Sequence, residues 1–212
     1  MVEHPLEGYD TIDRDWTDRF AAARTWEDFD MGDPVQDLYL FRSFLDRQEI
    51  VFPTLLDAGC GWGRYIWRFT RCDYTGIDHS DEMLKVARED ERNNRPHIKF
   101  VSGTTSAMPF ENHSFDGIWS CCALAGVPMR HLVEVLEEHR RVLRPTGIMT
   151  VVMADSLWDE EGVSHTKFGD MYHSQYTLET FLTYIKQTGF EILDYINRHG
   201  EGSYTVTVRN PA

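Results

Sequence analysis

Three glycines at alternate positions, directly after a short apolar run, are the first sign of chemistry in this chain. Gly59, Gly61 and Gly63 follow the run Leu55-Leu56-Asp57-Ala58. Glycine tolerates a positive φ and lets a ligand come close to the backbone, so this pattern is typical of a turn that holds a nucleotide. A dinucleotide site has glycines at the first, third and sixth positions, but the sixth position counted from Gly59 is Arg64. The spacing therefore argues against an NAD-dependent oxidoreductase.

The second sign is an acid, Asp78, at the end of the run Gly76-Ile77-Asp78 and 21 residues after Asp57. A carboxylate at the end of the next strand can accept hydrogen bonds from both hydroxyls of a ribose. Isolated glycines could simply make a tight turn between a strand and a helix. Together with Asp78, they favour a site for a nucleoside.

A parallel sheet is the element that can position these residues, because short apolar runs alternate with helical segments from residue 50 onward. We expect strands at 54–58, 73–78, 97–102, 115–120 and 147–154, and helices near 62–69, 81–92, 130–143 and 177–188. Two further strands, 190–198 and 203–209, flank Gly200-Glu201-Gly202 as a hairpin. The prediction is an α/β, Rossmann-like fold: a mostly parallel seven-stranded sheet with helices on both faces and a C-terminal antiparallel hairpin.

The first 49 residues are predicted to form a helical lid or flank of the same structural domain. Apolar residues at helical spacing predict a helix at 9–24. A second helix is expected to start at Asp33 as N-cap, with Pro34 in the first helical position. Residues 50–212 are predicted to form the core. The polar stretch at about 155–176 is an insert in it, on the side where a second substrate (the acceptor) would bind.

Residues 54–80 resemble the nucleoside-binding half of the class I S-adenosylmethionine-dependent methyltransferases of the small-molecule type. In that family an acid precedes alternating glycines and a second acid ends the next strand. The resemblance continues through 100–103, through Met108-Pro109-Phe110 and the Ser114-Phe115-Asp116 that follows it, and through 141–147. It therefore covers about residues 50–154 in order. It implies the methyltransferase fold, with S-adenosyl-L-methionine as cofactor and S-adenosyl-L-homocysteine as product.

The resemblance also implies a set of cofactor-binding residues. Asp78 would take the ribose hydroxyls, with His79 beside the adenine, and Asp57 would help to hold the loop and the amino group. Thr104 and Thr105 stand where the family often has an acid for the adenine amine, a departure in which a hydroxyl can still accept. The full set is Asp57, Gly59, Cys60, Gly61, Gly63, Asp78, His79, Thr104, Thr105, Ser120 and Cys121.

Methyl transfer from a sulfonium mostly requires alignment and the exclusion of water, and a base is needed only when the acceptor loses a proton early. The catalytic candidates are Asp155, His131 and His173, with His165 and Tyr172 also in acceptor-side segments. Asp155 is the best placed, because it follows the fifth strand at the carboxyl edge. An ordinary surface or core histidine is the alternative for each histidine.

The segment Ser120-Cys121-Cys122-Ala123-Leu124 contains no acid. Magnesium prefers hard oxygen ligands, so we expect no metal site and a metal-independent reaction. The adjacent cysteines Cys121 and Cys122 can suggest a thiophilic substrate such as arsenite. We prefer the alternative that they are small buried residues.

The charge balance bears on the partners. The chain has 35 acids against 21 bases, a net charge of −14, which repels phosphate backbones and anionic bilayers at long range. No apolar run approaches the roughly 18–20 residues of a membrane span. Four irregularly spaced cysteines do not make a disulfide framework, so we expect a cytoplasmic protein with reduced thiols.

We therefore expect a methyltransferase with a small-molecule acceptor, no membrane partner and no nucleic acid. A methyltransferase acting on tRNA or protein, and a non-catalytic nucleoside-binding scaffold of the same fold, are the alternatives. The acceptor and the oligomeric state stay open.

Overall fold

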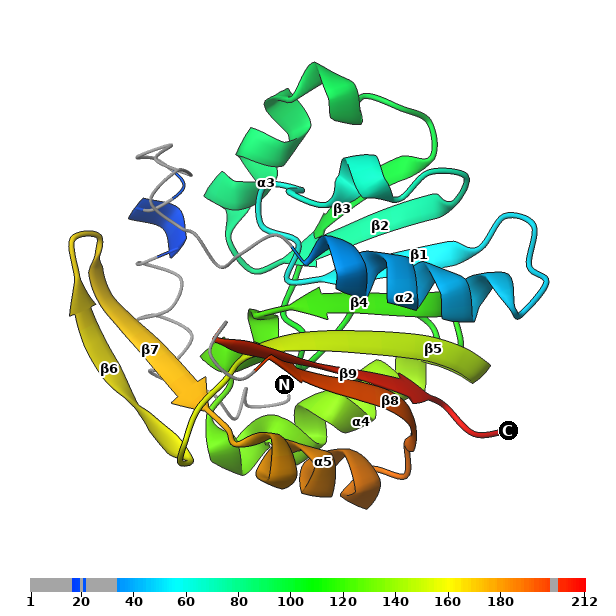
Figure 1. Cartoon of the computed structure of the whole chain (residues 1–212). Coiled ribbons are helices and arrows are strands. Elements are labelled where there is room, and N and C mark those ends of the chain that lie inside the picture. The colour runs from blue at the N-terminus through cyan, green and yellow to red at the C-terminus, as the bar shows by residue number, and fades with distance from the viewer. Residues whose placement is uncertain (1–16, 20, 22–33, 199–201) are drawn as a thin grey trace.

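A seven-stranded sheet organises the chain. The computed structural model describes residues 17–19, 21, 34–198 and 202–212, and the sheet has the order β3-β2-β1-β4-β5-β9-β8 (Figure 1). Strands β1 to β5 pair in parallel, whereas β9 runs antiparallel to both β5 and β8. This confirms the predicted fold. The strands are β1 Thr54–Ala58, β2 Asp73–Asp78, β3 Ile98–Ser102, β4 Phe115–Cys121, β5 Leu143–Ala154, β8 Glu191–Arg198 and β9 Ser203–Arg209.

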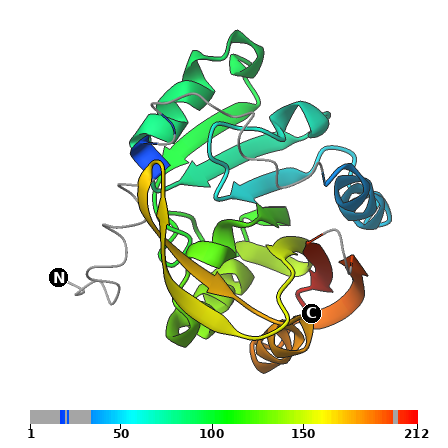
Figure 2. The ribbon, with the colours of Figure 1, turned by 60° about the vertical axis from the view of Figure 1, so that its left-hand side comes forward.

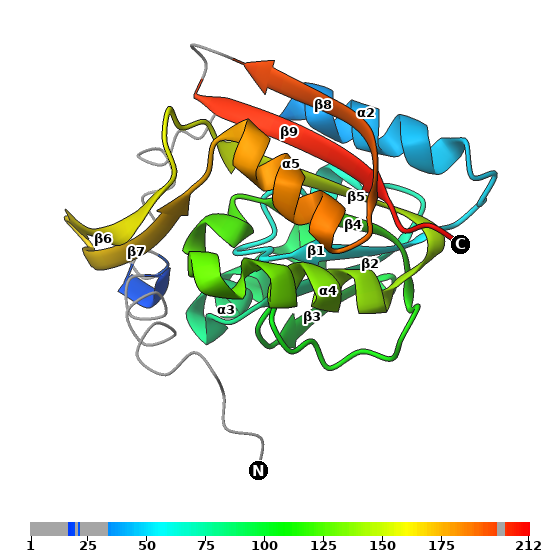
Figure 3. The same ribbon diagram turned by 90° about the horizontal axis from the view of Figure 1, so that it is seen from below.

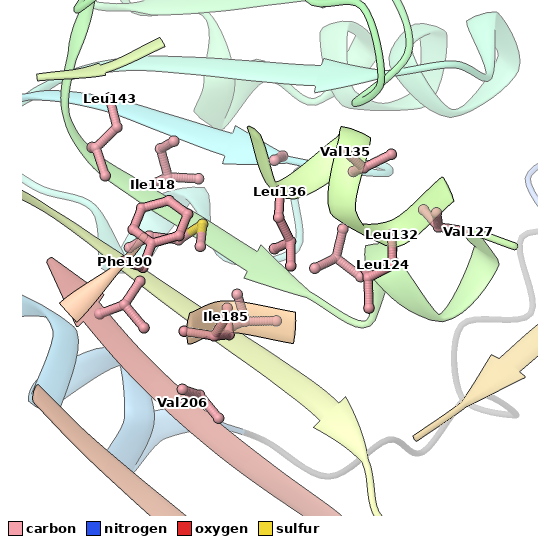
Figure 4. Packing of buried hydrophobic residues seen from close by; sticks show 14 of the residues in the cluster. Ile118, Leu124, Val127, Leu132, Val135, Leu136, Leu143, Ile185, Phe190 and Val206 are labelled. Carbon is pink, nitrogen blue, oxygen red and sulfur yellow. The ribbon is translucent and has the colours of Figure 1, made fainter. Parts of the chain in front are cut away.

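Helices cover both faces of the sheet (Figure 3). On one face, α4 (Leu132–Val142) and α5 (Leu178–Gln187) bury their apolar sides in the larger hydrophobic core, shown in Figure 4. On the other face, α2 (Val35–Asp46) packs against β4 and β5 in a second core that contains Trp119. α3 (Asp81–Glu89) lies against β2 and β3. Both faces are therefore buried, as a parallel sheet requires.

Three sequence-based boundaries need correction. The expected helix at 62–69 is wrong: turns occupy most of it, and only the 3₁₀ helix η2 (Ile66–Arg68) is helical. The left-handed backbone at Gly61 and Gly63 interrupts a regular helix there. α3 ends at Glu89 rather than 92. β5 begins at Leu143 rather than 147, and its register with β4 shifts between Leu143 and Ile148.

The polar stretch after β5 folds as a second, two-stranded sheet. β6 (Glu160–Thr166) pairs antiparallel with β7 (Gly169–Gln175). This hairpin extends away from the main sheet (Figure 1), and its tip lies beside the helical turn at residues 17–19 and 21 (Figure 2). At that tip, a Cβ on Gly169 would come within 2.8 Å of the Arg19 guanidinium. The hairpin therefore builds a wall at the carboxyl edge of the main sheet.

Three predictions fall largely or wholly outside the described residues. Of the helix expected at 9–24, residues 17–19 and 21 are described and are helical. The expected N-cap Asp33 and most of the hairpin turn at 200–202 also lie outside the described residues. The expected place of Pro34 in the first helical position is wrong: Pro34 is the N-cap residue of α2, where no side chain caps the helix. In the part of the chain that the structure describes, no helix is both long and apolar enough to cross a bilayer.

Candidate active site

The glycine turn is tied to the neighbouring strand by its own backbone. The amides of Gly59 and Cys60 both donate to the carbonyl of Ile77, at 2.9 and 3.0 Å. Gly59 has a φ of 77°, and a Cβ there would lie 2.2 Å from the Cβ of Ala123 in the 3₁₀ helix η4 (Ala123–Gly126). Only glycine allows this close approach, so the turn and η4 are held together at the carboxyl edge.

Asp78 connects the glycine turn to α3. One carboxylate oxygen accepts from the Gly61 amide at 2.8 Å and the other from the Ser80 amide at 3.0 Å. Its side chain is nearly buried, yet it reaches the cavity described below. Ser80 caps α3 by accepting from the Met83 amide at 3.1 Å, as its sequence position predicts, and its hydroxyl also bonds to Asp18.

Asp57 lies beneath the turn and is almost inaccessible to solvent. The Tyr74 hydroxyl donates to its carboxylate at 2.6 Å. Burial raises the pKa of Asp57 to about 7; the Tyr74 hydrogen bond opposes the rise and the nearby charge of Asp78 adds to it. A carboxyl group that changes charge near neutral pH therefore underlies the turn.

A cavity of about 380 Å³ opens at the carboxyl edge of the sheet, where the turn, η4 and the β6–β7 hairpin meet. Most of the cofactor residues expected from the sequence line it: Gly59, Cys60, Gly61, Asp78, His79, Thr104, Thr105 and Cys121. Asp57, Gly63 and Ser120 do not line it. Thr104 shares a hydrogen bond with Ser106, 3.0 Å between hydroxyl oxygens, at the same wall.

The hairpin supplies the opposite wall. The Tyr172 hydroxyl donates to Glu161 at 2.7 Å, and Glu161 also accepts from the Met129 amide at 2.8 Å. These hydrogen bonds lower the pKa of Glu161, so it carries a charge at neutral pH. His173, whose Nδ1 is 3.2 Å from the Ser164 hydroxyl, also lines the cavity. Of the three catalytic candidates, His173 is therefore the one that the fold brings to the cavity.

The other two catalytic candidates lie elsewhere. His131 precedes α4, where its ring bonds to Arg130 and Glu134, both at 3.0 Å. Asp155 follows β5, but the chain turns toward the hairpin there and its amide donates to the Gly202 carbonyl at 2.9 Å. Neither side chain lines the cavity. Their expected place depended on where β5 leads, which the sequence alone did not show.

Cys121 and Cys122 differ from the small buried residues that we expected. Both side chains are partly exposed and line the cavity, with their sulfur atoms 3.9 Å apart. Cys60 and Cys72 are buried. The Tyr65 hydroxyl lies 3.4 Å from the Cys121 sulfur.

Several cavity residues carried no signal that the sequence reasoning used. Arg64 and Tyr65 follow the glycine turn directly, so their place after that motif could have pointed to them. The residues of β7 could not be found in this way, because the hairpin that carries this strand was not predicted. The residues after β4, in and beside η4, follow no motif of this kind. The missed residues include Arg64, Tyr65, Val127, Met171, Ser174 and Gln175.

The sequence is similar to known methyltransferases. Residues 55–147 match the family model described as a methyltransferase domain. A sterol 24-C-methyltransferase of Debaryomyces hansenii is 34% identical over 152 residues, 65% of this chain and 40% of that enzyme. A malonyl-[acyl-carrier protein] O-methyltransferase of Enterobacter lignolyticus is 36% identical over 111 residues, 50% of this chain and 41% of that enzyme. The chain thus spans less than half the length of these relatives.

A solved structure matches the whole fold. The 1,6-didemethyltoxoflavin-N1-methyltransferase of Burkholderia thailandensis, with bound 1,6-didemethyltoxoflavin and S-adenosylhomocysteine, superposes with a TM-score of 0.73. The match covers 100% of this chain and 92% of that one, at 18% sequence identity. At this identity the likeness establishes the fold.

Proposed function

We propose that this chain, which carries a class I S-adenosylmethionine-dependent methyltransferase domain, transfers a methyl group from S-adenosylmethionine to a small organic acceptor by in-line displacement. One observation carries the proposal. A single cavity joins Asp78 and the glycine turn on one side to the wall built by the β6–β7 hairpin on the other. Such a space can hold a donor and an acceptor side by side while water is excluded.

The residues present fit the cofactor. Gly61 has a φ of 52°, and a Cβ there would meet nothing nearer than the Met83 sulfur at 3.9 Å, so the space above the turn is open. The cavity volume of about 380 Å³ is within the usual range for small-molecule sites. When bound, S-adenosylmethionine supplies an electrophilic methyl group on a sulfonium.

The chain's own residues then have distinct tasks. Asp78 offers carboxylate oxygens to the ribose, and the backbone of Gly59 and Gly61 lies against the bound nucleoside. The hairpin and η4 exclude water from the acceptor side. His173 can accept a proton at a ring nitrogen if the acceptor is a phenol or an alcohol. Thr104 and Ser106 present hydroxyls to the remaining wall.

Transfer of a labelled methyl group tests this function. The protein is incubated with methyl-labelled S-adenosylmethionine and a cell extract, and the label is followed in the small-molecule, RNA and protein fractions. We expect label in the small-molecule fraction, and much less label when Asp78→Ala replaces the wild type at the same low concentration of S-adenosylmethionine. Label in RNA or protein would contradict the small acceptor, and no label in any fraction would contradict the enzyme.

We also propose a cytoplasmic location. All four cysteines are unpaired in the structure, which agrees with a reducing compartment. Fractionation of the source cells, with the protein detected by antibody, would test it. Recovery with a membrane or secreted fraction would contradict it.

A further inference from the structure

The end of β4 brings two cysteine side chains to one place, which a continuous strand would not do. Successive side chains of a strand point to opposite faces. β4 ends at Cys121, and Cys122 takes a left-handed backbone with a φ of 59°. An L-residue rarely adopts this conformation. Here the Cys122 amide donates to the Val152 carbonyl at 2.9 Å, which holds it there.

As a result the two thiols form a pair in the cavity wall. Their sulfur atoms are 3.9 Å apart, and both side chains line the cavity. The separation is beyond a disulfide bond but suits two sulfurs that bind the same atom. We propose that Cys121 and Cys122 form a chelating dithiol that binds a trivalent arsenical on the acceptor side of the cavity.

The chemistry of such a chelate balances without an oxidant. An organic arsenical with two hydroxyls on arsenic loses both, each leaving as water with one thiol proton. Two arsenic–sulfur bonds form, two arsenic–oxygen bonds break, and arsenic stays trivalent. Neutral thiols and a neutral arsenical give a neutral product, so no charge is placed in the partly buried wall.

The same surroundings disfavour a metal cation. A cation needs thiolates, and the hydrogen bond between the two thiols together with burial holds the pKa of Cys121 above its ordinary value. Across the described residues, no group of three or more histidine, cysteine or acidic side chains is arranged to hold a metal ion. A trivalent arsenical can instead react with two thiols and keep its organic group. The binding does not depend on methyl transfer.

Phenylarsine oxide is the probe for this site. Its affinity for the full chain is measured by calorimetry without cofactor, and the adduct is located by mass spectrometry of peptides. A chelate should withstand an excess of a monothiol and be released by a vicinal dithiol. We expect one arsenical per chain, bridging Cys121 and Cys122.

Three variants separate chelation from other thiol reactions. Cys121→Ala and Cys122→Gly each leave one thiol, so we expect affinity to fall about 100-fold or more, the usual scale of a lost second attachment. Glycine suits the left-handed backbone at position 122, so this variant keeps the fold even if Cys121→Ala does not. Cys72→Ala is the matched control, because that thiol is buried and bonds to the Phe69 carbonyl.

The proposal is overturned if the wild type binds no arsenical, if both single variants bind as tightly as the wild type, or if the adduct is on Cys60 or Cys72. A separate titration with S-adenosylhomocysteine distinguishes this outcome from failure of the proposed function. Arsenical binding without nucleoside binding would support the dithiol site and contradict the proposed methyltransferase function. Nucleoside binding without the arsenical adduct would support the proposed function and contradict the dithiol site.

Discussion

Asp78 has two tasks at one carboxylate: it fixes the glycine turn through the Gly61 amide, and it reaches the cavity where a ribose would lie. Asp78→Ala removes both. We predict that affinity for S-adenosylhomocysteine falls by about tenfold to a hundredfold, the usual range for a lost charge-assisted hydrogen bond. Calorimetric titration of the folded variant measures it.

Asp73→Ala is the matched control, because Asp73 begins the same strand and its exposed carboxylate bonds to the exposed His97 ring. Its nucleoside affinity should equal that of the wild type. Unchanged affinity in Asp78→Ala would mean that the acid at the end of β2 does not hold the ribose.

Asp57 predicts a pH dependence of stability. Its pKa is about 7 in the fold, against 3.8 for an ordinary aspartate, so between these values the native state holds a proton that the unfolded state has lost. The stability contributed by this group is therefore present below about pH 4 and is lost as the pH rises to about 7. The loss is on the order of 2–4 kcal/mol.

Asp57→Asn isolates this effect, since an amide keeps an acceptor for the Tyr74 hydroxyl but does not titrate. Urea unfolding of both proteins at several pH values gives the difference in the free energy of unfolding. We expect the wild type to lose stability relative to Asp57→Asn from pH 4 to 7 and to level off above. A difference that is constant with pH would contradict the raised pKa.

At the scale of elements, the packing of the glycine turn against η4 is the contact on which the site depends. Gly59→Ala would place a Cβ 2.2 Å from the Cβ of Ala123, on a backbone with a φ of 77°. We predict that the free energy of unfolding falls by about 3 kcal/mol or more, because left-handed strain and overpacking add together. Thermal unfolding measures it.

Gly202→Ala separates strain from the steric clash. Gly202 has nearly the same φ, 76°, but a Cβ there would meet nothing within 4 Å. Gly202→Ala should therefore lower the free energy of unfolding only by the left-handed strain, about 1–2 kcal/mol. If both variants lose the same free energy of unfolding, η4 moves away from the new Cβ at little cost, and the close contact with the glycine turn does not stabilise the fold.

Glu161 of β6 accepts from the Met129 amide, which ties the β6–β7 hairpin to the body, and from the Tyr172 hydroxyl, which joins the two strands of the hairpin. Glu161→Ala should increase hydrogen exchange of the hairpin amides while those of the main sheet keep their protection. Glu160→Ala is the control, because its side chain accepts from the nearby Trp158 indole. Equal exchange in the two variants would contradict the attachment.

These elements also show what the sequence can predict. β1 and β2 have the expected bounds, because apolar runs that end in glycine or an acid are a strong local signal. The hairpin was missed because its strands are polar and mostly exposed or half-buried, so no alternation of apolar residues marks them. His173 could be separated from His131 only once the hairpin was known. The left-handed backbone of Cys122 likewise had no local signal.

At the scale of the whole molecule, one cavity must hold both the methyl donor and the acceptor. Its donor side comes from loops after β1, β2 and β3, and its acceptor side from η4 and the hairpin, far apart in sequence. Parallel strands bring the first set together, because their carboxyl ends share one edge. Binding of S-adenosylmethionine on this donor side is therefore the step on which the proposed function depends.

Calorimetric titration with S-adenosylmethionine and S-adenosylhomocysteine, with NAD as control, tests that claim most directly. We predict that both sulfur nucleosides bind at one site per chain with a micromolar Kd, about −8 kcal/mol, and that NAD gives no heat. Absence of heat from both sulfur nucleosides at high concentration, or binding of NAD in their place, would contradict it.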